Sequence, residues 1–268
     1  MPFLYGRAIA FFVLFISMVS FSSSGFADDR ALERIRKNGE IKCGTYVLGS
    51  LFSYSEDGTP QGFTVDLMNE ISQRTGLKVR YTEISSFATV FEDLKTGHYD
   101  MLCTPLLLLP STSLKALPGD FLIEDAINIY GDASIDYSGV TNFEQLNDKK
   151  YTFVGMDNEL GGIYAPQMFP EAKLNLLPLG TPPSNMFLDV FARKANFVVL
   201  SHLAELAYSQ ENPGKLKQVT ERSLFKASVR LFYAEDSYIL RTNIEAIVDD
   251  MRREGILDKI IAKNGLDH

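Results

Sequence analysis

Residues 41–104 alternate between short apolar runs, which predict strands, and amphipathic runs, which predict helices. The expected strands are 41–46, 77–84 and 98–104, and the expected helices between them are 65–75 and 87–96. Thr64 and Ser86 precede these two helices and are their expected N-caps. Strands that alternate with helices form parallel sheets with helices packed on their faces, so this pattern restricts the chain to the α/β class.

A second series of the same kind follows. Its expected strands are 151–156, 173–179 and 196–201, and its expected helices are 161–169 and 184–194. The segment FLIEDAINIYG (121–131) joins the two series. After them come a strand at 228–236 and two helices at 237–255 and 256–264. Two α/β units in one chain predict two lobes, and ligands usually bind in the cleft between such units.

The first 27 residues have a different character. Arg7 is followed by the apolar run IAFFVLFISMVSF, then by SSSGFA and an abrupt change to DDRALERIRK. This pattern is typical of a cleavable signal peptide, with Gly25 at −3 and Ala27 at −1. The alternative is an uncleaved anchor helix, but the run is short for a membrane span of about 20 residues. We therefore expect export to the periplasm.

Composition excludes several functions. The net charge is −8 without a basic run, which argues against nucleic acid as a partner. The chain has only three histidines and none of the common hydrolase, zinc-protease or phosphate-loop motifs. We therefore expect no metal, no cofactor and no enzymatic activity.

Several segments, in order, resemble the periplasmic solute-binding proteins of the polar amino-acid uptake type, family 3. Gly62-Phe63 and Asp66-Leu67 match the core G-F-x-x-D-L of the family signature. The segment FEDLKTGHYDMLCT matches L-x-x-G-x-x-D before the third strand, and VDDMRREGILDKIIAKNG matches the terminal helices. No single motif is specific, but their order makes the resemblance strong from Asp28 to Leu266.

The resemblance implies the type II periplasmic-binding-protein fold, with each lobe a mostly parallel sheet flanked by helices. Lobe 1 would comprise 28–126 and 229–268, and lobe 2 would comprise 127–228. It further implies a monomer that closes on a small-molecule ligand and then docks on a membrane permease.

The family usually binds an α-amino acid with an Arg after the third strand and an Asp at the end of the last lobe 2 strand. These positions fall here on or next to Thr112 and on Ser201, and no Arg occurs between Arg80 and Arg193. Leucines 106–109 occupy the polar positions after the third strand. The loss of both charges predicts an uncharged pocket and a ligand other than an ordinary amino acid.

The resemblance places a set of residues beside the ligand. They are Thr45, Tyr46, Phe52, Phe87, Thr104, Leu107, Thr112, Asn158, Glu159, Gly161, Gly162, Ser201 and His202. Residues 158–162 precede a helix, whose amides bind anions or carbonyl oxygens, while glycines let the backbone approach. Each assignment has an alternative: Phe52 in the core, 158–162 as an ordinary helix cap, and His202 as a structural residue.

Cys43 and Cys103 are the two cysteines of the chain. An even count in an oxidising compartment suggests a disulfide, while two buried thiols are the alternative. The resemblance puts them on neighbouring strands of lobe 1, within bonding distance.

Three functions are compatible with the sequence. The first is the binding component of an uptake system. The second is a binding protein without transport, acting as a sensor or as an accessory to another periplasmic protein. The third is an enzyme that resembles cyclohexadienyl dehydratase, with Glu159 or His202 as the acid.

Overall fold

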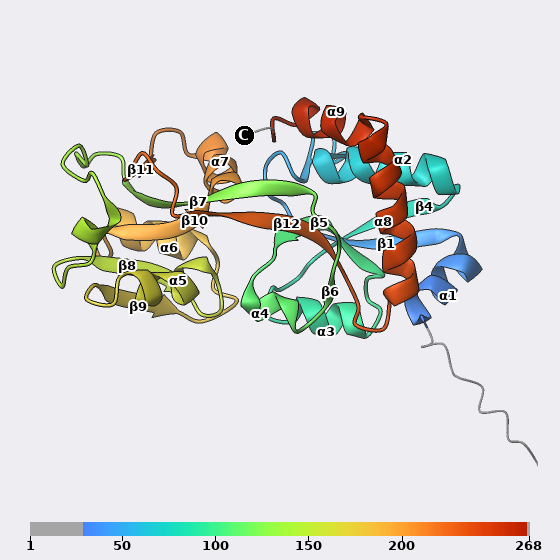
Figure 1. Ribbon diagram of the computed structural model, residues 1–268, viewed down its shortest axis with the longest axis horizontal. Coiled ribbons are helices and arrows are strands. Elements are labelled where there is room, and N and C mark those ends of the chain that lie inside the picture. The colour runs from blue at the N-terminus through green and yellow to red at the C-terminus, as the bar shows by residue number, and fades with distance from the viewer. Residues whose placement is uncertain (1–28, 267–268) are drawn as a thin grey trace, which may run out of the picture.

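The structure is a computed structural model that describes residues 29–266, and it has the two-lobed α/β architecture that the alternating pattern predicts (Figure 1). The predicted signal peptide, residues 1–27, lies outside the described part of the chain. Among the described residues no helix is long and apolar enough to cross a membrane.

Lobe 1 is built on a sheet whose strands β1 and β5 lie at its centre. The strands are β4 (Lys78–Glu83), β1 (Glu40–Thr45) and β5 (Met101–Leu107), and β1 runs parallel to both neighbours. One face carries α1 (Arg30–Asn38), α2 (Phe63–Thr75), α8 (Tyr238–Arg253) and α9 (Ile256–Lys263), and the other carries α3 (Val90–Lys95). Successive strand residues point to opposite faces, so Met101 packs with the first group and Leu102 with α3.

Lobe 2 repeats this arrangement. Its parallel strands are β10 (Phe197–Ser201), β8 (Thr152–Met156) and β9 (Lys173–Leu177). Around them lie α5 (Leu160–Met168), α6 (Ser184–Phe191), α7 (His202–Glu211) and a short 3-10 helix, η1 (Phe143–Leu146). Phe153 and Phe197 pack on the face that bears α5, and Val154 and Val198 pack on the face that bears α6.

Two long antiparallel strands join the lobes, as the centre of Figure 1 shows. They are β7 (Ile123–Asp132) and β12 (Phe225–Tyr233), and the order β4-β1-β5-β12-β7-β10-β8-β9 makes one continuous sheet. β12 pairs with β5 in lobe 1, and β7 pairs with β10 in lobe 2. The predicted lobe boundaries at 126 and 229 fall inside these strands.

Smaller elements complete the described fold. β6 (Leu117–Pro118) pairs with β12, β11 (Leu216–Gln218) pairs with β7, and β2 (Ser53–Tyr54) pairs with β3 (Pro60–Gln61). The sequence reasoning missed α7 and the single-turn helix α4 (Pro110–Ser113).

Two predicted helix starts are wrong. The helix expected at 87–96 forms only from Val90 to Lys95, because Ser86 Oγ accepts the Ala88 N–H at 3.1 Å within a turn. Phe87 therefore lies in a loop. The helix expected at 65 begins at Phe63, and its N-cap is Gly62 rather than Thr64. Gly62 has φ 106°, and a Cβ there would lie 2.9 Å from the Ser50 carbonyl oxygen, so glycine is required.

The third strand is longer than expected and includes two of the four leucines, Leu106 and Leu107. Pro105 is tolerated inside it because β1 has already ended at Thr45 and the pairing with β12 is irregular between Arg230 and Phe232. The Pro105 carbonyl instead accepts a hydrogen bond from Tyr46 Oη at 2.9 Å.

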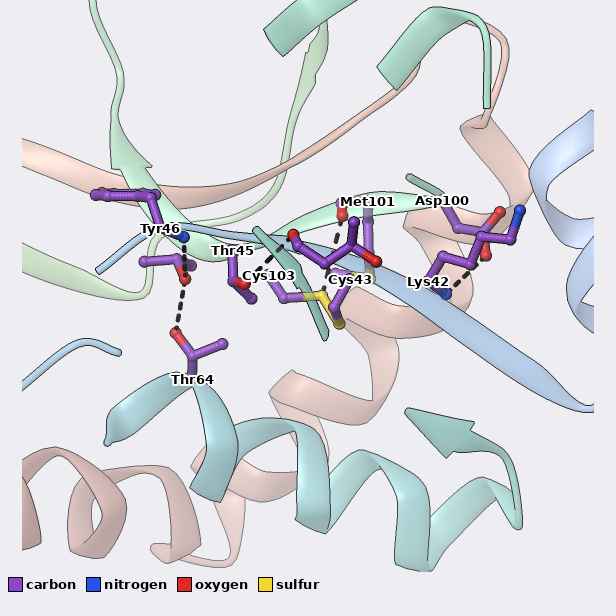
Figure 2. The surroundings of a disulfide bond; sticks show 10 residues. Lys42, Cys43, Thr45, Tyr46, Thr64, Asp100, Met101 and Cys103 are labelled. Atoms are coloured by element: carbon purple, nitrogen blue, oxygen red, sulfur yellow. Dashed lines mark hydrogen bonds between the residues drawn. A yellow bond between two sulfur atoms is a disulfide. The ribbon is translucent and has the colours of Figure 1, made fainter. Parts of the chain in front are cut away.

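Of the two alternatives that the sequence left open for Cys43 and Cys103, the structure has the disulfide rather than two thiols (Figure 2). The Cα atoms are 5.3 Å apart, and both residues are fully buried in the core beneath α2. The bond ties β1 directly to β5, the two strands that lead into the space between the lobes.

Candidate functional site

A cavity of about 760 Å³ lies between the two lobes. Lobe 1 contributes residues 46–49 and Leu51, Phe87 with the start of α3, the end of β5 and α4. Lobe 2 contributes the start of α5, one face of α6, the end of β10 and one face of α7. The volume falls in the range of small-molecule sites, which is about 300–1,000 Å³.

The lobes are in contact around this cavity. Ser111 Oγ of α4 donates a hydrogen bond across the cleft to the Asn158 carbonyl oxygen at 3.0 Å. Gly49 lies so close to α7 that an added Cβ would be 3.0 Å from the Ala207 Cβ. The two lobes therefore touch each other on both sides of the cavity.

The walls of the cavity are mainly apolar. Leu106, Leu107 and Leu109 from the four-leucine segment lie on the lobe 1 side. Tyr46 and Phe87 meet there edge to face, with ring centroids 5.1 Å apart. On the lobe 2 side the ring centroids of Phe187 and Tyr208 are 4.0 Å apart. Such walls favour a ligand with an apolar or aromatic body.

The prediction of an uncharged pocket is wrong. Asp125, Glu159, Lys115 and Glu211 all line the cavity. The prediction considered only the two positions at which family 3 carries its charges. The fold brings in the carboxylate of Asp125 from the crossing strand β7, in addition to that of Glu159, which was already among the predicted ligand residues.

Glu159 is the N-cap residue of α5, but its side chain makes no capping hydrogen bond. Among the described residues its carboxylate has neither a hydrogen bond nor an ion pair. Burial raises the pKa of Glu159 from 4.5 to about 6. The carboxylate is thus partly desolvated without compensation.

Asp125 is held more firmly and is only 2 % exposed. Its carboxylate accepts a hydrogen bond from the Leu203 N–H at 3.3 Å and interacts with the Ser201 hydroxyl, both at the start of α7. Burial raises the pKa of Asp125, and these hydrogen bonds partly oppose the rise. The contact fixes the start of α7 to the crossing strand β7.

Tyr46 lies near both acids. Burial raises the pKa of Tyr46, and the charges of Glu159 and Asp125 add to the rise. Its phenol remains a neutral hydrogen-bonding group at any physiological pH.

Eight of the predicted ligand residues line the cavity, and five do not. Those on the lining are Tyr46, Phe87, Leu107, Thr112, Asn158, Glu159, Gly161 and Ser201. Those away from it are Thr45, Phe52, Thr104, Gly162 and His202. Contact between any lining residue and a ligand stays a prediction.

Three of the residues away from the cavity belong to the interior of lobe 1. Thr45 and Phe52 are fully buried, and Phe52 packs against Tyr81 with ring centroids 5.5 Å apart. Thr104 Oγ1 accepts the Tyr46 N–H at 3.4 Å and lies 3.4 Å from Thr64 Oγ1. These contacts organise the ends of β1 and β5 rather than the cavity surface.

The other two lie in lobe 2. A Cβ on Gly162 would lie 2.1 Å from the Met156 carbonyl oxygen, so glycine is needed there for α5 to pack on β8. The missing side chain at Gly162 is thus accounted for by helix–strand packing. His202 is the first residue of α7, and its Nδ1 lies 4.0 Å from Glu205 Oε2.

Two lining hydroxyls also serve as caps. Ser201 is the N-cap of α7, and its Oγ accepts the Ala204 N–H at 3.1 Å. Thr112 Oγ1 donates to the Leu109 carbonyl at 2.9 Å and accepts the Leu109 N–H at 3.1 Å. Thr112 therefore orders α4, on or next to the position that the resemblance assigns to the family's Arg.

The sequence reasoning missed a group of lining residues. Among them are Lys115, Asp125, Met186, Phe187, Ala204 and Tyr208. Ala204 and Tyr208 were missed with α7, although their spacing of four residues puts them on one helix face. Asp125 had a weak signal, as an acid inside the apolar segment that joins the lobes. Among the described residues no group of His, Cys, Asp and Glu could hold a metal ion.

Residues 41–111 match the family described as bacterial extracellular solute-binding proteins, family 3. A membrane-bound lytic murein transglycosylase F from Aeromonas hydrophila subsp. hydrophila is 33 % identical over 79 residues, which are 30 % of this chain and 16 % of that protein. The chain therefore matches only a small part of that relative's length.

Solved structures share the whole fold. An ancestral amino acid-binding protein, a precursor of cyclohexadienyl dehydratase, matches with a TM-score of 0.71 and 18 % identity, over 87 % of this chain and 97 % of that one. The solute receptor for L-cysteine of Neisseria gonorrhoeae matches with a TM-score of 0.71 and 16 % identity, over 87 % and 92 % of the two chains.

These likenesses confirm the type II periplasmic-binding-protein fold. The similarity to the bacterial extracellular solute-binding proteins, family 3, covers residues 41–111, and the rest of the chain shares the fold of the solved structures.

Proposed function

We propose that this protein binds a small solute in the cavity between its lobes and delivers it to a membrane permease. The observation that carries the proposal is the cavity itself, because both lobes line it and two continuous strands join them. The names of the structural relatives, which bind amino acids, support solute capture. We further propose that the protein acts in the periplasm, after removal of residues 1–27, as a monomer.

Ligand binding can be tested by thermal-shift screening of small solutes followed by calorimetry. Ala204→Trp would place an indole in the cavity from α7 and should abolish binding, while Ala262→Trp on the exposed surface of α9 is the matched control. The proposal fails if no solute of any class binds, or if Ala204→Trp leaves binding unchanged.

A binding role outside transport is the second candidate. The similarity of 79 residues to a lytic transglycosylase favours it, because that relative is not named as a transport protein. Loss of solute uptake in cells that lack this chain would support transport, whereas unchanged uptake of a solute that binds in vitro would support the second candidate.

We also propose that the protein is not an enzyme. Glu159 lines the cavity and has a raised pKa, as a general acid requires. The other buried carboxylate of the cavity, Asp125, already accepts a hydrogen bond from the start of α7 and is therefore not a free base that could act with Glu159. His202, the other acid considered, does not line the cavity.

A further inference from the structure

The charges that line the cavity are unbalanced. Asp125 and Glu159 are set into it, and Glu211 lies exposed at its edge. Among the described lining residues Lys115 is the only basic one, and it is exposed to solvent just after α4. A ligand inside the cavity therefore meets more negative than positive charge.

The two inner acids are not equivalent. Asp125 is engaged by the Leu203 N–H and the Ser201 hydroxyl, whereas Glu159 has no partner in the described part of the chain. An ionised carboxylate that has lost water without gaining a partner is unfavourable. A ligand cation beside Glu159 would offset this cost.

The apolar walls suit the rest of such a ligand. Tyr46 and Phe87 on one side, and Phe187 and Tyr208 on the other, present aromatic rings to the cavity. Aromatic faces attract organic cations and also pack on apolar groups. On the lobe 1 side Leu106, Leu107 and Leu109 line the cavity, and among the described lining residues only the exposed Lys115 could pair with a ligand carboxylate.

We propose that the ligand is an organic cation with an apolar body and without a carboxylate, such as a protonated or quaternary amine, and that Glu159 binds its charge. This inference rests on the proposed solute-binding function and names the chemistry of its ligand. Glu159 is then the residue that determines charge specificity.

The test uses matched compounds with one apolar body: 4-phenylbutylamine, 4-phenylbutanol and 4-phenylbutyrate, together with a series of alkyl, aryl and quaternary amines. Calorimetry at pH 8 should show amines binding at least tenfold more tightly than the alcohol or the carboxylate. Glu159→Gln should weaken amine binding tenfold or more, while Glu144→Gln, an exposed carboxylate of lobe 2 outside the cavity lining, should change it less than twofold.

The proposal is overturned if no amine binds, if the carboxylate binds as tightly as the amine, or if Glu159→Gln leaves amine affinity unchanged. Binding of a carboxylate or a neutral solute that Ala204→Trp abolishes would reject the cationic ligand yet retain the solute-binding function. Failure of every solute class would reject both.

Discussion

The disulfide between Cys43 and Cys103 should account for a large part of the stability of lobe 1. The bond closes a loop with a sequence separation of 60 residues, which contains α2, β4 and α3. A cross-link of this kind stabilises the folded state mainly by restricting the unfolded chain. Replacing both cysteines with alanine removes the restriction without burying a new polar group.

The magnitude follows from the length of the loop. With about 60 residues in the loop, the chain-entropy relation gives a loss of about 4 kcal/mol in the free energy of unfolding at 25 °C. For a chain of this size, that loss corresponds to a fall of roughly 8–16 °C in the melting temperature.

Guanidinium denaturation of the wild type and of the double variant Cys43→Ala/Cys103→Ala would measure the loss. A reducing agent should shift the wild-type transition towards that of the variant and leave the variant unchanged, which is the internal control. If the two proteins differ by less than about 1 kcal/mol, the chain-entropy reasoning is refuted for this bond.

Three further predictions concern lobe 2. Gly162→Ala should lower the free energy of unfolding by about 2–4 kcal/mol, because its Cβ would meet the Met156 carbonyl oxygen at 2.1 Å. Gly139→Ala, with open space around it, is the control and should lower the free energy of unfolding by less than about 0.5 kcal/mol. Equal losses of the two variants in urea denaturation would contradict the packing argument. The pKa of Glu159 is raised from 4.5 to about 6 in the folded protein, so the protonated carboxyl favours folding. Its contribution to the free energy of unfolding is fully present below pH 4.5 and is lost as the pH rises through 6. Without ligand, the free energy of unfolding of Glu159→Gln should therefore rise by about 2 kcal/mol relative to that of the wild type between pH 4.5 and pH 7.5. A difference in unfolding free energy between the two proteins that does not change with pH would count against the raised pKa. Incubation with prephenate or arogenate should give no turnover by absorbance or mass spectrometry, and measurable turnover that Glu159→Gln abolishes would establish an enzyme instead.

A stability gain on removing Glu159 would also support its role as a binding residue. Functional sites often retain groups that destabilise the protein until the ligand arrives. The same variant should then gain stability without ligand and lose affinity for amines. A gain in stability without a loss of amine affinity would support the raised pKa of Glu159 but contradict its role in ligand binding.

Local patterns were enough to establish the α/β class and the alternation of strands and helices, because periodicity and breakers act within about ten residues. The segment DMLCTPLLLLPSTS shows the limit of this reasoning. Its pattern predicts a buried strand from Asp100 to Thr104, but the strand extends to Leu107 because Leu106 and Leu107 pair with Arg230 and Val229 of β12. This pairing depends on a strand that is distant in the sequence, so the pattern of the segment itself does not reveal it.

The pairing of Cys43 with Cys103 had to await the structure. The cysteine count allowed a bond or two buried thiols, and the decision depended on whether β1 and β5 lie side by side with the right offset. Gly162 shows the same dependence, since the structure explains its lack of a side chain by the close approach of β8.

The sequence by itself determined which segments fold and which family they resemble, because these properties depend on neighbouring residues and on the order of motifs. Only the tertiary structure decided the character of the cavity. Asp125 and Glu159 lie 34 positions apart and reach the same space through a crossing strand and the start of a helix. Electrostatic interactions depend on distance in space and on burial, and neither can be counted along the chain.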